Sequence, residues 1–288
     1  MPPFLRSTGQ RLTVSPTTPA DRQDLERLLD AARWRHLHLD WFDPVLLIEE
    51  APFLKLANSR SVLACLGCPP EFPHRTWIRV FAAAGAVGLQ EAWDHLWPAT
   101  LQAAQAIGLR TFEALVTAAW MAPLLSAAGF VTSDEVVFLE RDGARPLRRA
   151  PSLGEIRSVS AQDLPALVEL DAQAFPESWR ISWRSLQAAW SSAAHASLVD
   201  FGGEILGYQI TSLSPTSAHL SRLAVAPDRA RQGLGAALTL DSMDVLSQMG
   251  ASRWTVNTQA SNLPALGLYQ RLGFRENGLR YPVYTARL

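Results

Sequence analysis

The sequence predicts an α/β chain built from two similar domains. Its 288 residues exceed the roughly 100–200 residues that one domain usually takes. The alternating segment His219–Val225 runs through a glycine-spaced turn into an apolar periodic segment, which is typical of a strand followed by a helix. A shift of 144 residues (273 minus 129) overlays Gly129-Phe130 on Gly273-Phe274, which indicates an internal repeat.

The composition is that of an ordinary folded protein, with 48% hydrophobic residues, 18% charged residues and a formal net charge of −1. It excludes a disordered or fibrous chain and gives no electrostatic reason to expect nucleic acid as a partner. No apolar run reaches the roughly 18 residues of a membrane span, and residues 1–10 lack the apolar core of a signal peptide. We therefore expect a cytoplasmic protein, monomeric or homodimeric, that binds neither nucleic acid nor membrane.

The chain has two cysteines, Cys65 and Cys68, in the pattern Cys-Leu-Gly-Cys. A zinc site of this kind needs a second pair of ligands, and His74 alone does not supply it. We expect reduced thiols at the end of a strand and no metal site.

The turn before residue 236 predicts a site for an anion. Gly233 and Gly235 stand where a helix begins, and a helix N-terminus offers unpaired N–H groups and a partial positive charge. A P-loop would need Lys and Ser or Thr after the last glycine, and the three-glycine dinucleotide fingerprint also fails here. The expected ligand is a phosphate or pyrophosphate.

A second strand and helix follow in residues 252–274. Ser261 or Asn262 can cap the helix, Pro264 suits its first turn and Gly273 its end. Asn262 and Tyr269 are two helical turns apart, so they lie along one side of the helix.

Together these two segments resemble the coenzyme A signature of the GNAT superfamily of N-acetyltransferases. The resemblance implies two tandem GNAT-like domains, each a mixed, mostly antiparallel sheet flanked by helices. It further implies that acetyl-CoA is bound by Leu223, Ala224, Val225, Arg231, Gln232, Gly233, Leu234, Gly235, Ala236, Asn262 and Tyr269.

Catalytic roles also follow from the resemblance. Tyr269 matches the general acid of the family, and the backbone N–H at Val225 matches the donor to the oxyanion. A thiol has a pKa near 8.5 and a tyrosine a pKa near 10, so a Tyr hydroxyl beside the sulfur can protonate the leaving thiolate.

Residues 155–288 resemble in particular the ribosomal-protein-alanine N-acetyltransferases, which acetylate a protein α-amino group. Asp171–Trp179 resembles their acceptor-side loop, and Arg280-Tyr281-Pro282 resembles a later loop. In that branch the base is a strand glutamate, and the matching residue here is Asn257, which cannot accept a proton.

His219 is the expected replacement for that base. Period-two alternation predicts that His219, Ser221, Leu223 and Val225 share one face of the strand, and a near-neutral pKa suits a general base. Glu177 and Glu204 are weaker carboxylate candidates.

The repeat suggests a division into residues 1–141, a degenerate GNAT-like domain; residues 142–153, a linker; and residues 154–288, the acetyltransferase domain. At the offset of 144, Leu125 stands for Tyr269 and Glu91 for Gly235. A glutamate at the head of the helix repels an anion, so we predict that the first domain binds no coenzyme A.

The predicted activity is acetyl transfer from acetyl-CoA to a primary amine, on a protein N-terminus or a small molecule. An α-amino group titrates near 7.7–8.0 and a lysine near 10.4, so loss of the glutamate base hinders a lysine acceptor most. The alternative is a non-catalytic sensor or scaffold that binds acyl-CoA.

Overall fold

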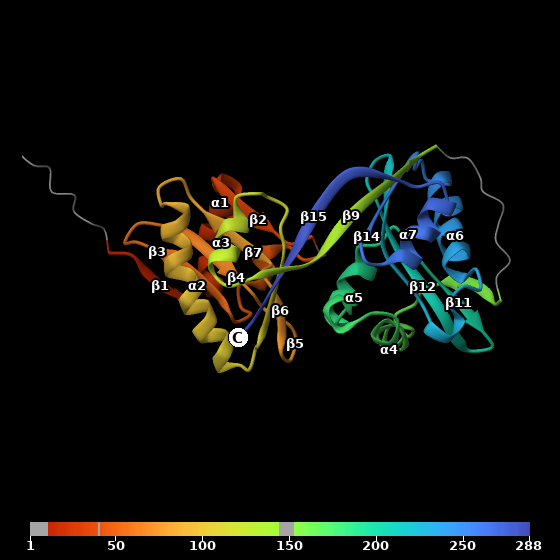
Figure 1. Cartoon of the computed structure of the whole chain (residues 1–288), viewed down its shortest axis with the longest axis horizontal. Coiled ribbons are helices and arrows are strands. Elements are labelled where there is room, and N and C mark those ends of the chain that lie inside the picture. The colour runs from red at the N-terminus through yellow and green to blue at the C-terminus, as the bar shows by residue number, and fades with distance from the viewer. Residues whose placement is uncertain (1–10, 40, 144–152) are drawn as a thin grey trace, which may run out of the picture. The chain divides into compact units, whose positions relative to one another are not determined.

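The computed structural model describes residues 11–39, 41–143 and 153–288. The chain forms two compact units, each made of largely antiparallel strands with helices packed on them (Figure 1). Unit 1 takes in the chain up to Ser133 together with Val283–Leu288, and unit 2 is Asp134–Pro282. The predicted α/β class with two repeats is confirmed. None of the helices in these ranges is long and apolar enough to span a membrane.

The elements of unit 1 are, in chain order, β1 (Thr13–Pro16), η1 (Pro19–Asp21), α1 (Arg22–Ala31), β2 (Trp34–Leu37), η2 (Pro44–Leu47), β3 (Phe53–Ala57), β4 (Val62–Gly67), β5 (Pro70–Phe72), β6 (Arg75–Trp77), β7 (Val80–Ala83), α2 (Leu89–Ala106), β8 (Thr111–Leu115) and α3 (Met121–Ala127). One antiparallel sheet has the order β1-β3-β4-β7-β2. A second group pairs β8 with β6 in parallel and β6 with β5 in antiparallel fashion.

Helices cover both faces of the first sheet in unit 1. Leu54, Leu66 and Phe81 point to the cluster under α2 and α3, whereas Cys65 and Val80, their neighbours in sequence, point to the cluster under α1. This alternation follows from the period of two in a strand. The result is a three-layer unit with the sheet in the middle.

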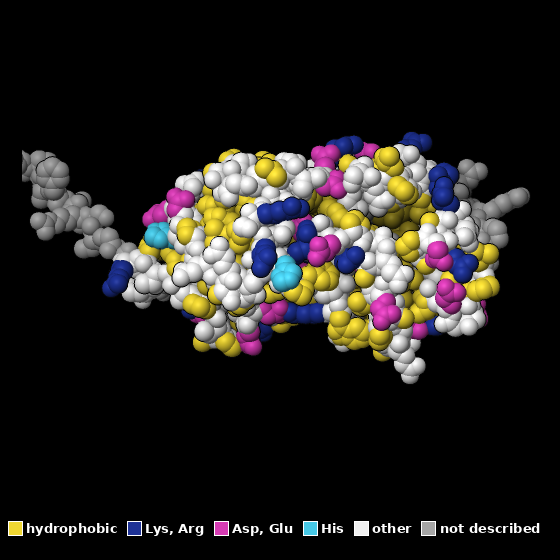
Figure 2. Space-filling model, turned by 60° about the horizontal axis from the view of Figure 1, so that its bottom comes forward, with side chains coloured by type: hydrophobic (Ala, Val, Ile, Leu, Met, Phe, Trp, Pro, Cys, Tyr) yellow, Lys and Arg dark blue, Asp and Glu magenta, His cyan; other side chains and the backbone are white. Residues whose placement is uncertain are grey.

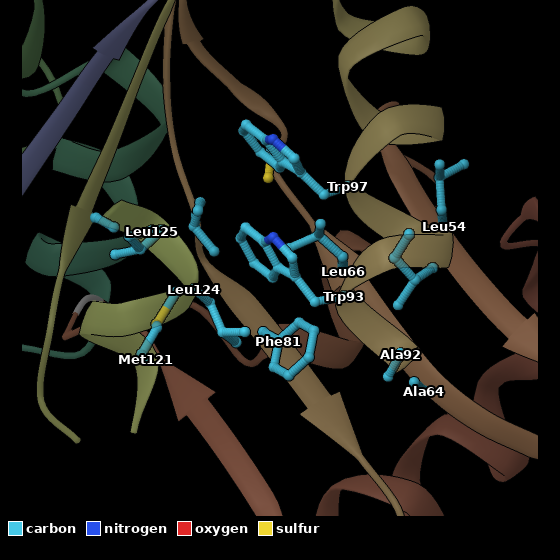
Figure 3. Packing of buried hydrophobic residues seen from close by; sticks show 14 of the residues in the cluster. Leu54, Ala64, Leu66, Phe81, Ala92, Trp93, Trp97, Met121, Leu124 and Leu125 are labelled. Atoms are coloured by element: carbon cyan, nitrogen blue, oxygen red, sulfur yellow. The ribbon is translucent and has the colours of Figure 1, made fainter. Parts of the chain in front are cut away.

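Tryptophans fill the core between α2 and the sheet. The rings of Trp93 and Trp97 stack with centroids 5.2 Å apart, and Trp97 also meets Phe112 edge-on at 5.1 Å. Figure 3 shows the indole of Trp93 between that of Trp97 and the ring of Phe81. Residues four apart on a helix share one side, so both rings belong to the same core cluster.

One detail of unit 1, the division of a predicted strand, differs from the simplest interpretation of the sequence, whereas the two cysteines are free thiols at the end of a strand, as expected. The stretch Trp77–Phe81, which is similar to the strand at 219–225, is divided between β6 and β7, which belong to different sheets. Cys65 and Cys68 are free and fully buried, and burial raises the pKa of the Cys65 thiol to about 12.

The elements of unit 2 are β9 (Val131–Asp142), β10 (Glu155–Ser158), α4 (Leu164–Ala174), η3 (Glu177–Trp179), α5 (Trp183–Ser191), β11 (His195–Phe201), β12 (Glu204–Leu213), β13 (Ser217–Val225), η4 (Pro227–Arg229), α6 (Leu234–Gln248), β14 (Arg253–Gln259), α7 (Leu263–Arg271) and β15 (Arg275–Arg287). Two of these strands cross the boundary of the unit, because β9 begins in unit 1 and β15 ends there. The strands follow the order β10-β11-β12-β13-β14-β9, and the pair β13–β14 is parallel. On the face shown in Figure 2, basic and acidic side chains are interspersed.

Each unit is completed by a strand from the other half of the sequence. β9 follows α3 of the first repeat, yet Val136–Asp142 pair with β14 in unit 2. β15 follows α7 of the second repeat, yet Val283–Arg287 pair with β8 in unit 1. The compact units therefore divide at Ser133 and Pro282 rather than at residues 141 and 154. Most of the expected linker, residues 144–152, lies outside the described residues.

Candidate active site

The strand, turn and helix around Gly233 are present in unit 2. β13 ends at Val225, η4 forms the turn, and α6 begins at Leu234 with Gly233 as its N-cap. Gly233 has a φ of +86°, a conformation that glycine adopts without steric cost. The first four N–H groups of α6, which have no partner within the helix, therefore lie beyond the end of β13.

Gly235 lies where α6 packs closely on its neighbours. A Cβ at this position would stand 3.1 Å from Leu268 Cδ2 and 3.7 Å from Leu223 Cδ2. Leu268 comes from α7 and Leu223 from β13. Residue 235 thus has to be small for the helix to begin this close to both elements.

The two parallel strands part beside this turn. β13 and β14 pair from Ser217 and Arg253 up to Leu220 and Val256, while the strands continue to Val225 and Gln259. This parting leaves the second half of β13 with one paired edge among the described residues, the edge that meets β12.

Backbone groups of β13 point into the parting. Ala226 N–H donates to the Leu206 carbonyl at 2.9 Å, and hydrogen-bonded pairs alternate along an antiparallel ladder. Ala224 is therefore hydrogen-bonded to β12, and the N–H and C=O groups of Leu223 and Val225 face the opposite way. These backbone groups therefore point to the side of β13 on which β14 no longer pairs with it.

Asn262 and Tyr269 lie at the two ends of α7. The Asn262 side chain caps the helix by accepting from Ala265 N–H at 3.3 Å, so of the two caps that the sequence allows, Ser261 and Asn262, the second is the one observed. Tyr269 is 5% exposed, with its ring 5.8 Å from that of Phe274. Burial raises the pKa of Tyr269 well above its usual value, and the charge of Arg222 opposes this, so the hydroxyl keeps its proton at neutral pH.

The prediction that His219 and Val225 share a face is wrong. β13 contains a bulge, because Thr211 pairs with Leu220 while the next residue along, Ile210, pairs with Arg222. Ser221 is the extra residue, and an extra residue reverses the alternation beyond it. His219 therefore shares a face with Arg222, opposite to the face of Leu223 and Val225.

The parallel pairing of β13 with β14 places His219 beside Asn257 on the neighbouring strand. His219 Nδ1 lies 2.9 Å from Thr255 Oγ1. Burial lowers the pKa of His219, and a hydrogen bond with Asn257 opposes this. The imidazole is therefore neutral at pH 7, next to the residue at which β14 leaves the ladder with β13.

A buried ion pair behind this site was not predicted from the sequence. Asp171 of α4 is 0% exposed and accepts hydrogen bonds from Arg222 Nε at 2.7 Å and Nη2 at 2.6 Å. It also accepts from the Tyr208 hydroxyl at 2.7 Å and from Ile181 N–H at 2.9 Å. The sequence does contain one signal for this pair, because Asp171 is a charged residue at a position of α4 where the pattern is apolar.

Arg222 joins the segment between α4 and α5 to β13. Its guanidinium donates to the Trp179 carbonyl at 2.8 Å and lies 3.8 Å from the ring centroid of Phe175. This is the segment that resembles an acceptor-side loop. The weaker candidate Glu204, by contrast, is an exposed partner of Arg229 at 3.7 Å, and Glu177 belongs to the short helix η3.

Among the described residues of unit 1, the corresponding strand edge is paired. β7, the counterpart of the end of β13 at the offset of 144, pairs with β4 on one side and with β2 on the other. β2 places His36 opposite Phe81, the counterpart of Val225. The counterparts of His219 and Asn257 are Arg75 and Glu113, which form an ion pair at 2.6 Å.

Comparison with known proteins identifies relatives of the second half of the chain. The model of the Acetyltransferase (GNAT) family matches residues 164–274. The [ribosomal protein bS18]-alanine N-acetyltransferase of Escherichia coli K12 is 33% identical over 149 residues, which cover 47% of this chain and 92% of that enzyme. The mycothiol acetyltransferase of Clavibacter sepedonicus is 34% identical over 137 residues, 45% of each chain, so the match spans about half the length of that enzyme.

Solved structures resemble the whole chain in fold. A tandem GNAT protein from the clavulanic acid biosynthesis pathway superposes with a TM-score of 0.69 at 16% identity and covers 96% of this chain and 98% of its own. A GCN5-related N-acetyltransferase from Kribbella flavida gives a TM-score of 0.70 at 15% identity, with 97% and 71% covered. Both repeats of the chain therefore have the fold that the sequence predicts.

Proposed function

The chain belongs to the GNAT family of acetyltransferases, and on this premise we propose that unit 2 transfers an acetyl group from acetyl-CoA to a primary amine by direct attack. The observation that carries the proposal is the parting of β13 and β14 beside the first turn of α6. It leaves a strand edge next to a helix N-terminus, which together suit an amide-containing arm that ends in a pyrophosphate.

The residues around this opening fit acetyl-CoA. Backbone groups of Leu223 and Val225 are directed into the parting and can pair with the amides of the pantetheine arm. The N–H groups at Gly233 and Gly235 can hold the pyrophosphate, and the lack of a Cβ at Gly235 lets the start of α6 pack closely against Leu268 of α7. We assign Arg231, Gln232, Leu234 and Ala236 to the same turn, Ala224 to the strand and Asn262 to the arm.

Two groups then act on the reacting atoms. Acetyl-CoA supplies the acetyl group as a thioester. The Val225 N–H donates to the carbonyl oxygen as negative charge develops on it. Tyr269, which burial keeps protonated, donates its proton to the departing sulfur.

His219 is the proposed base. Its lowered pKa keeps an unprotonated ring nitrogen at neutral pH, and it lies beside Asn257, where the acetyltransferases of the ribosomal-protein-alanine type have a glutamate. A weak base suffices for an acceptor that is partly neutral already, such as an α-amine with a pKa of about 8. We therefore favour an α-amine or a weakly basic small-molecule amine over a lysine side chain.

Calorimetry and a turnover assay test this proposal together. We expect acetyl-CoA to bind the full chain, and a panel of amines to include one that releases free coenzyme A thiol. Tyr269→Phe should lower kcat by roughly 10²-fold or more while the Kd for acetyl-CoA stays within about twofold. Tyr284→Phe, at a tyrosine on β15, is the matched control and should change neither value.

The outcomes separate the two functional classes. Binding with turnover that Tyr269→Phe leaves unchanged refutes the role of Tyr269 as acid. Binding without turnover on any amine identifies the alternative, an acyl-CoA sensor or scaffold, which the amide at Asn257 favours. Absence of binding refutes both.

A further inference from the structure

The two faces of β14 differ in what they contact. Trp254 and Val256 are buried in the core beneath α6 and α7. Thr255 and Asn257 alternate with them and therefore lie on the opposite face, where Thr255 meets His219. Asn257 is exposed. This face therefore carries the proposed base and is open beside it.

β9 extends this face by one strand. Phe138 is the register partner of Asn257, so the two side chains project to the same side of the sheet. Val137 and Leu139, on either side of Phe138, point into the core. The order across the face is thus His219, Asn257 and Phe138.

A second aromatic ring lies against Phe138. The ring centroids of Phe138 and Tyr281 are 5.2 Å apart with an interplanar angle of 74°, an edge-to-face arrangement that is favourable for aromatic pairs. Both residues are half-buried. They form an apolar surface, here called the aromatic platform, next to the polar pair His219 and Asn257.

Several charged side chains of β9, β14 and β15 are paired with one another. Arg280 donates to Glu135 at 2.7 Å and to Glu276 at 2.5 Å, and Glu140 pairs with Arg253. Ionic groups that are already paired offer little to an anionic or strongly cationic ligand. The interaction that the aromatic platform can make with a ligand is therefore contact with the rings of Phe138 and Tyr281.

We propose that the aromatic platform of Phe138 and Tyr281 is the acceptor subsite, and that it selects primary amines attached to an aromatic or bulky apolar group. This rests on the proposed function. Asn257 is the first β14 residue beyond the ladder with β13, so an amine nitrogen at His219 and Asn257 reaches the parting where the thioester is expected. The remainder of such a molecule then lies over Phe138, one strand away, and Tyr281 borders it.

Steady-state kinetics on the full chain tests the subsite. The probes are phenylalaninamide and alaninamide, two weakly basic α-amines that differ in the aromatic ring. We expect the KM for phenylalaninamide to be about tenfold lower, because stacking on one ring contributes roughly that factor. Phe138→Ala should abolish the preference without changing the KM for acetyl-CoA, and Phe138→Leu should restore part of it. Phe201→Ala, at an exposed phenylalanine on β11, is the control and should keep the full preference.

Each result has a distinct meaning. Equal KM values for the two amines, or a preference that persists in Phe138→Ala, overturn the subsite while leaving the acetyltransferase proposal intact. Failure of both amines and of the wider panel to release coenzyme A overturns the two proposals together. A preference lost in Phe138→Ala and kept in Phe201→Ala supports the subsite.

Discussion

Asp171 on α4 and Arg222 on β13 form a bidentate ion pair whose carboxylate is fully buried, with the two donating Arg222 nitrogens within 2.7 Å of the carboxylate oxygens. Arg222 follows the bulge at Ser221, and the same guanidinium holds the Trp179 carbonyl. The strand that is proposed to bind the cofactor and the segment between α4 and α5 are thus fixed by one side chain.

Removing one partner of this pair should destabilise unit 2 strongly. Arg222→Leu leaves the Asp171 carboxylate buried without its counterion, which typically costs about 3–5 kcal/mol. Asp171→Leu should be similarly harmful, since it leaves a buried guanidinium. The double variant should recover much of the loss, because two apolar side chains pack without charge. Urea unfolding of all four proteins measures the coupling, and additive single effects would refute the interpretation.

Acetyl-CoA should bind once per chain. In unit 1 the edge of β7 is already paired with β2, and Glu91 occupies the first turn of α2. The variant Gly235→Glu gives the first turn of α6 the glutamate that α2 has at the matching position. It should lower the affinity for acetyl-CoA by at least about tenfold, because the carboxylate repels the pyrophosphate and the larger side chain takes up space. Calorimetry gives both numbers. Glu91→Gly is the reciprocal control; a stoichiometry of two in the unmodified chain would contradict the role of β2.

Residues 154–288 alone should fold poorly. This fragment lacks β9, whose residues Val136–Asp142 pair with the whole of β14, and an uncovered strand edge is prone to aggregation. A fragment of residues 131–288, which keeps β9, is the matched comparison. Circular dichroism and size-exclusion chromatography should show a cooperative, monodisperse protein more readily for the longer fragment. Equal behaviour of the two would show that β9 is dispensable for unit 2.

Stability of unit 1 should fall in mild acid because of His36. Its Nε2 lies 3.1 Å from the Ile78 carbonyl, Nδ1 is buried without a partner, and burial lowers the pKa of His36 to about 4. The unfolded state, with a pKa near 6.5, therefore binds the proton first, and the stabilisation present above pH 6.5 is lost as the pH falls toward 4. The loss amounts to about 2 kcal/mol at pH 5.

The comparison for this effect is His36→Gln, whose amide can still donate to Ile78 and does not titrate. Urea unfolding followed by tryptophan fluorescence at pH 7 and pH 5 should show a smaller decrease for the variant. The same decrease in both proteins would assign the acid sensitivity to other groups.

Local features were predictable from the sequence to the extent that they depend on neighbouring residues. The Asn262 cap, the start of α6 at Gly233 and the end of α7 at Gly273 follow from the conformational preferences of those residues. The packing of Trp93 with Trp97 follows from helical spacing. Tandem arrangement was visible as a constant offset of 144 residues.

Features that depend on pairing between distant strands were not predictable. The bulge at Ser221 exists because β12 and β13 change register there, and nothing in an alternating sequence marks it. For the same reason the faces of His219 and Val225 were misjudged. The ion pair of Asp171 with Arg222 joins residues 51 positions apart, which only the packed fold brings together.

The reciprocal placement of β9 and β15 ties the two halves of the gene to each other. A recombination event that replaced the second half alone would give unit 1 a β15 from another protein to pair with its β8. The β14 of the replacement would then have to pair with the original β9. The first repeat, which we expect to bind no coenzyme A, thereby serves as a structural donor, since unit 2 takes one of its strands, and with it Phe138, from that half of the sequence.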